Sequence, residues 1–118
     1  MEIDKAILAF SQSEKIKEGI IWVSQVLNII QDLAEGEKKG GEKVVYALIN
    51  MISQEIKLAR MVSGLNMWDE VEPSLDKALL MITSGLSQEA TTHLSKALSK
   101  VTNIGQRSMS ILKEKNLL

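Results

Sequence analysis

His93 is the residue in this chain best suited to catalysis, and it is the only histidine; the chain has no cysteine. A serine protease-like triad uses an imidazole base held by further groups, and protein zinc sites take several histidines or cysteines as ligands. One histidine and no thiol therefore exclude multi-histidine metal sites, cysteine zinc sites, disulfides and thiol catalysis. We predict a protein that is not an enzyme and that holds no metal and no cofactor.

A basic arc surrounds His93 on the last predicted helix. At about 100° per residue, four side chains share one polar arc beside the apolar stripe: His93, Lys96, Lys100 and Arg107. The arc predicts a site for an anion or an acidic partner, such as residues 69–76 of another subunit, although a solvated face with cations near the helix C-terminus has the same pattern. A net charge of −1 and the lack of interleaved aromatic residues argue against nucleic acid, so a nucleic-acid-binding subunit that uses Lys96, Lys100 and Arg107 is an alternative function only.

Lys96 follows His93 at a spacing of three residues. This spacing resembles the His-x-x-Lys-Gly motif on an exposed helix face of histidine-phosphotransfer domains. The resemblance implies that His93 accepts a phosphoryl group and that Lys96 helps to neutralise it. Ser95 stands where that family has an apolar residue, and Ala97 stands where it has glycine. Phosphotransfer through His93 is therefore an alternative function.

The elements that must position these residues are organised around the most apolar stretch, residues 19–34. On a helix over residues 13–35, one stripe consists of Ile16, Ile20, Val23, Leu27, Ile30 and Ala34. A second stripe, roughly 100° away, consists of Trp22, Val26, Ile29 and Leu33. A helix with two apolar faces must be covered on both, by its own chain or by another subunit. Polar residues within this short stretch argue against a membrane span.

The two tryptophans indicate where a partner would bind, because tryptophan is enriched at interface hot spots. Trp22 belongs to the second stripe, and Trp68 lies in a corner between two predicted helices. We predict an interface formed by Trp22, Val26, Ile29, Leu33 and Trp68. Alternatively, the corner tryptophan closes the end of the bundle.

Helical signals divide the chain into about four helices. The first covers residues 2–35, and the pattern leaves open whether it breaks near Ser11, where capping-box spacing occurs. The charged, glycine-rich run at 36–41 predicts a turn. A second helix is expected over residues 42–63, a short turn over 67–72, a third helix over 73–84, and a fourth from Ser87 nearly to the C-terminus.

Composition agrees with this division. The 118 residues are 45% hydrophobic and include one proline and few aromatics, which favours a single helical domain over residues 1–118. The predicted fold is an all-α antiparallel up-down helical bundle. The acidic start predicts no signal peptide, and the lack of cysteine fits the cytoplasm. We expect a non-catalytic interaction or scaffold protein, either a homo-oligomer or a small subunit of a larger complex, with no membrane insertion.

Overall fold

The chain is helical along almost its whole length in this computed structural model, which describes residues 1–117. The elements are α1 (Ile3–Ile30), α2 (Glu35–Ser63), the short 3-10 helix η1 (Asn66–Glu70), α3 (Glu72–Thr83) and α4 (Ser87–Glu114). Within residues 1–117 there is no strand, and no helix is long and apolar enough to cross a membrane. The predicted all-α bundle is confirmed.

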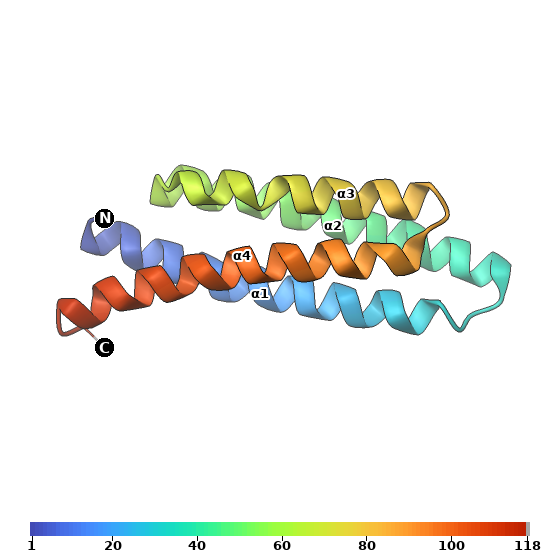
Figure 1. Cartoon of the computed structure of the whole chain (residues 1–118), viewed down its shortest axis with the longest axis horizontal. Helices are drawn as coiled ribbons and strands as arrows, with labels where there is room; N and C mark the ends of the chain where they lie inside the picture. Colours follow the sequence, from blue (N-terminus) through green and yellow to red (C-terminus); the bar gives the residue numbers. More distant parts are fainter. Residues whose placement is uncertain (118) are drawn as a thin grey trace.

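Helix α1 is central to the bundle because it packs along both α2 and α4. Helix α3 packs mainly on α4 and touches α2 less. Figure 1 shows the four helices lying along the same long axis, with both termini at one end of the molecule. Consecutive helices run in opposite directions, which is the antiparallel up-down arrangement expected from the sequence.

The first apolar stripe of α1 forms the centre of the core. Its members from Ile16 to Ile30 are all buried. They meet buried residues of the two neighbouring helices, namely Val45, Ile49, Ile52 and Ile56 of α2 and Leu94, Ala97, Val101 and Ile104 of α4. Ala34, which was predicted to extend this stripe, is instead exposed because α1 ends at Ile30.

Helix α1 runs through Ser11 without a break. Roughly three turns after the start of the helix, the buried Ser13 donates its hydroxyl hydrogen to the carbonyl oxygen of Phe10, at 2.8 Å, so the serine is satisfied within the helix. Gly105 of α4 lies directly opposite, and a Cβ atom at this glycine would be 2.7 Å from Ser13 Oγ. The glycine therefore permits the close approach of α1 and α4 at this level.

The predicted turn over residues 36–41 is wrong. The chain turns over residues 31–34, α2 begins at Glu35, and Gly40 and Gly41 lie inside the helix. A Cβ atom at Gly41 would be only 2.8 Å from Cγ2 of Ile30. The glycine at this position serves the packing of α2 against the end of α1, and this close contact outweighs the low helix propensity of glycine.

We expect the two adjacent glycines to respond in opposite ways to alanine. Gly40→Ala meets no atom within 4 Å, so it should stabilise the fold by about 0.5–1 kcal/mol through helix propensity. Gly41→Ala gains the same propensity but forces Ile30 to move, and overpacking of this kind costs about 1–3 kcal/mol. Urea unfolding followed by circular dichroism measures both. Equal stabilisation by the two variants would mean that α1 and α2 are not in close contact here.

Candidate interaction surface

The second apolar stripe of α1 is left largely uncovered by the described part of the chain. The exposed fractions are 67% for Trp22, 64% for Ile29 and 40% for Leu33. Val26 is half-buried and packs against the core. Trp22, Val26 and Ile29 therefore lie on the outer side of α1, beyond the core stripe, whereas Leu33 lies in the turn that follows the helix.

Helix α2 extends this apolar surface with residues that the sequence interpretation missed. A groove of about 670 Å³ runs between α1 and α2, and its lining includes Trp22, Val26, Met51 and Leu58. Val44, Met51 and Leu58 are exposed and follow one another at intervals of seven residues. The sequence signal that could have revealed these three residues is their heptad spacing, because it places apolar side chains along one seam of a helix.

We define the α1–α2 surface as the following seven residues: Trp22, Val26 and Ile29 of α1, Leu33 of the turn after it, and Val44, Met51 and Leu58 of α2. The two charged groups that line the adjoining groove are Lys15 and Glu55, and they form an ion pair with 3.1 Å between Nζ and Oε2. Such a half-exposed pair contributes little to stability. Because the two charges are opposite, the lining of the groove carries no net charge.

Trp68 does not belong to this surface. Its side chain is fully buried, and its indole Nε1 donates a hydrogen bond to Ser63 Oγ at 3.1 Å. The reason is that η1 packs against α2, α3 and α4, which directs the indole into the core. Its indole is enclosed by its own chain and is not available to a partner.

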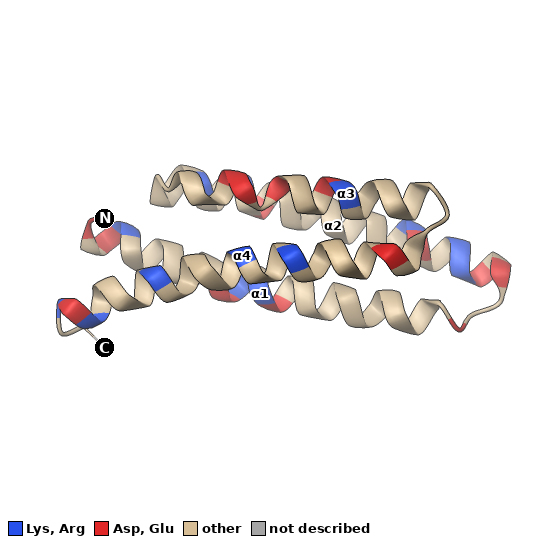
Figure 2. Cartoon of the chain, viewed as in Figure 1, with Lys and Arg blue, Asp and Glu red and all other residues tan. Residues whose placement is uncertain are grey.

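The predicted basic arc of α4 contacts the chain itself. Figure 2 shows basic residues spaced along α4. The Nζ of Lys100 donates to the carbonyl oxygen of Glu70 at 3.0 Å and lies 3.3 Å from Ser74 Oγ. Arg107 donates to Met67 Sδ at 3.8 Å, whereas Lys96 is exposed. Two of the arc's cations therefore hold η1 and the start of α3 against α4, where the sequence interpretation placed an acidic segment of another subunit.

His93 is half-buried beside these cations. Its Nδ1 atom is buried and has no hydrogen-bond partner within residues 1–117. Of the two ring nitrogens, Nδ1 is thus shielded from an incoming phosphoryl donor. In the alternative function, phosphotransfer, Nε2 would therefore be the nitrogen that accepts the phosphoryl group.

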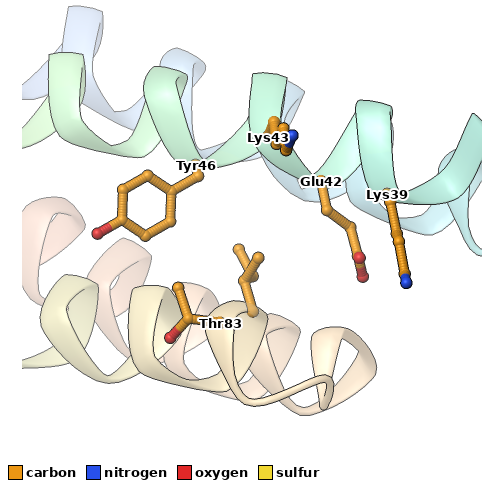
Figure 3. Close-up of a pocket in the computed structure, with 6 residues that line it drawn as sticks. Lys39, Glu42, Lys43, Tyr46 and Thr83 are labelled. Carbon is orange, nitrogen blue, oxygen red and sulfur yellow. The ribbon is translucent and has the colours of Figure 1, made fainter.

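A second hollow of about 360 Å³ lies between α2 and α3, which pack on each other less closely than α2 packs on α1 or α3 packs on α4. In Figure 3, Tyr46 and Glu42 of α2 reach toward the helix that carries Thr83. Glu42 accepts a hydrogen bond from the Ser87 hydroxyl. The polar side chains around the hollow are exposed or half-buried, so they lack the convergent, buried placement typical of a small-molecule site.

Comparisons with protein-family models, curated proteins and solved structures gave no match to this chain.

Proposed function

We propose that this protein is a non-catalytic interaction or scaffold protein that works in the cytoplasm, and that it binds protein partners through the α1–α2 surface. It acts as a homo-oligomer or as a small subunit of a larger complex. The lack of cysteine supports the cytoplasm as the compartment, because proteins of this reducing compartment do not rely on disulfide bonds for stability.

The observation that carries the proposal is the exposure of Trp22, at 67%, within an apolar surface that spans two helices. A large exposed apolar patch marks an interaction site on a folded protein. Tryptophan is among the residues that contribute most to binding when a partner covers them. The neighbouring methionine, Met51, is flexible and polarisable, and such side chains adapt well to a binding partner.

The lining of the groove supports binding in preference to chemistry. Its one pair of charged groups, Lys15 and Glu55, is engaged in an ion pair. The remaining surface consists mainly of aliphatic, methionine and tryptophan side chains. Surfaces of this composition gain free energy chiefly from removing apolar area from water.

We expect the α1–α2 surface to be covered by protein in the cells that make this chain. A photoreactive benzoylphenylalanine in place of the exposed Met51 should form a covalent adduct with a protein on illumination, detected as a heavier band that retains this chain. The same residue placed at Ser99, on the exposed side of α4, should not. Adding Trp22→Glu should abolish the Met51 adduct, because a carboxylate opposes burial against an apolar partner.

The result at Ser99 is the matched control for random collision. Adducts of equal yield at both positions, or none at Met51, would remove the proposed function. The test makes no assumption about the partner, so it detects a second copy and an unrelated protein equally.

A further inference from the structure

We infer that the occupant of the α1–α2 surface is a second copy of this chain, related by a two-fold axis that runs parallel to the helices. Helix α1 of one copy then faces α2 of the other. This inference rests on the proposed function and specifies the partner. It follows from three features of the surface: its periodicity, its size and its charge.

Both helices carry the periodicity of helix-on-helix packing. On α1, Leu8, Trp22 and Ile29 occupy positions that differ by multiples of seven, and on α2 Val44, Met51 and Leu58 do the same. Apolar residues at this interval form the seam between helices that pack side by side. A pair of antiparallel helices with such seams fits another antiparallel pair, and a second copy presents that pair with the same spacing.

The surface has the area of a stable interface. The α1 seam from Leu8 to Ile29, which continues the α1–α2 surface toward the start of the helix, is roughly 32 Å long at 1.5 Å per residue. Two adjacent helices are roughly 20 Å wide, which gives a footprint of roughly 640 Å² per copy. A standard stable interface buries about 600–1,000 Å² on each partner. The exposed fractions of 67% for Trp22 and 59% for Met51 show that these side chains still have area to bury.

Charge permits self-association and selects its direction. In each copy, Lys15 of α1 lies at the level of Glu55 of α2, because the two groups form an ion pair. Rotation about an axis parallel to the helices does not change the position of a residue along that axis. Lys15 of each copy therefore faces Glu55 of the other copy. An axis perpendicular to the helices would instead bring Lys15 opposite the apolar end near Ile29. Burying an amine against apolar side chains is costly, and we therefore assign the parallel axis.

The parallel two-fold axis also gives complementary contacts at other positions along the helices. Gly19 lies at the level of Ile52, since a Cβ atom at this glycine would be 3.6 Å from Ile52 Cγ1. Trp22, one turn further along α1, therefore faces the part of α2 that contains the small, exposed Ala47. The exposed Glu18 and Gln54 also lie at one level, where the amide of Gln54 in the second copy can donate to the Glu18 carboxylate.

The test uses the absence of cysteine. Glu18→Cys and Gln54→Cys are made as separate chains, mixed and oxidised. Light scattering of the wild type should give twice the mass of one chain, and the mixture should yield a covalent dimer joining one variant to the other. Each variant alone should yield little covalent dimer. Because both positions are exposed, neither substitution disturbs the core.

A second measurement addresses the charges. Lys15→Glu should raise the dimer dissociation constant roughly tenfold, because it sets like charges opposite each other between the copies. The exchange Lys15→Glu with Glu55→Lys should restore the wild-type constant. Equal affinity for wild type and Lys15→Glu would overturn the assigned direction.

The outcomes separate the inference from the proposed function. A wild type that stays monomeric at all concentrations overturns the second copy as occupant, and the Met51 adduct then shows whether another protein binds there. A dimer in which each single-cysteine variant links only to itself overturns the parallel axis. A dimer that yields no covalent product in the mixture and persists in Trp22→Glu overturns the use of this surface.

Discussion

Trp68→Ala should lower the free energy of unfolding by about 3–5 kcal/mol, the range measured when a large buried aromatic side chain is removed. The indole is fully buried where η1 meets α2, α3 and α4, so its loss leaves a cavity that three helices would have to close. Small domains have only about 5–15 kcal/mol of stability. Urea unfolding monitored by circular dichroism, at one protein concentration, gives the difference.

Two milder variants separate the packing of Trp68 from its hydrogen bond. Trp68→Phe keeps most of the buried ring but loses the Nε1 donor. Ser63→Ala keeps the indole and leaves its Nε1 without the acceptor that is now 3.1 Å away, which should cost about 1–3 kcal/mol. If Trp68→Ala lost less than Ser63→Ala, the indole would not be packed as a core residue.

The core of the bundle was predictable because it depends on local periodicity. The stripe from Ile16 to Ile30 repeats every three or four residues, and helical geometry alone places these side chains on one face. The end of α2 was also predictable from the local sequence, since Gly64 adopts the left-handed conformation that favours glycine after a helix, with φ of 69°. Neither feature needed knowledge of a neighbouring helix.

Other features depended on contacts between elements and could not be read locally. Gly40 and Gly41 have the composition of a turn, but the approach of Ile30 to Gly41 places them inside α2. Trp68 and Trp22 have the same side chain, yet one is fully buried and the other is 67% exposed. The difference arises from which helices surround each residue, and the local sequence pattern does not specify these neighbours.

The α1–α2 surface was half predictable for the same reason. The wide apolar arc of α1 indicated a second contact surface, but its relation to α2 required the pairing of the two helices. The basic arc shows the opposite case, because Lys100 and Arg107 share a face as predicted and are nevertheless engaged by residues 67–74 of their own chain. A charge pattern indicates what a face can bind, and only the fold indicates what already occupies it.

Ile20→Glu should unfold the protein, whereas Trp22→Glu, two residues along the same helix, should leave it folded. Ile20 is fully buried in the core, where a carboxylate has no water and no partner, and the cost of such burial is several kcal/mol. Trp22 is 67% exposed, so a carboxylate there stays in water and should change the stability of the single chain by no more than about 0.5 kcal/mol. Circular dichroism measures the loss of helix, and light scattering gives the mass.

Trp22 gives a sharper comparison than Val26, because Val26 is half-buried against the core and its substitution would disturb both surfaces. Ser99→Glu on α4 is the control, since it adds the same charge at an exposed position on a helix that does not belong to the α1–α2 surface. If Trp22→Glu lost its helical signal as Ile20→Glu does, the second stripe would be ordinary core. A folded Trp22→Glu variant whose mass falls to that of one chain, beside an unchanged Ser99→Glu, would instead identify this stripe as the surface that holds the assembly together.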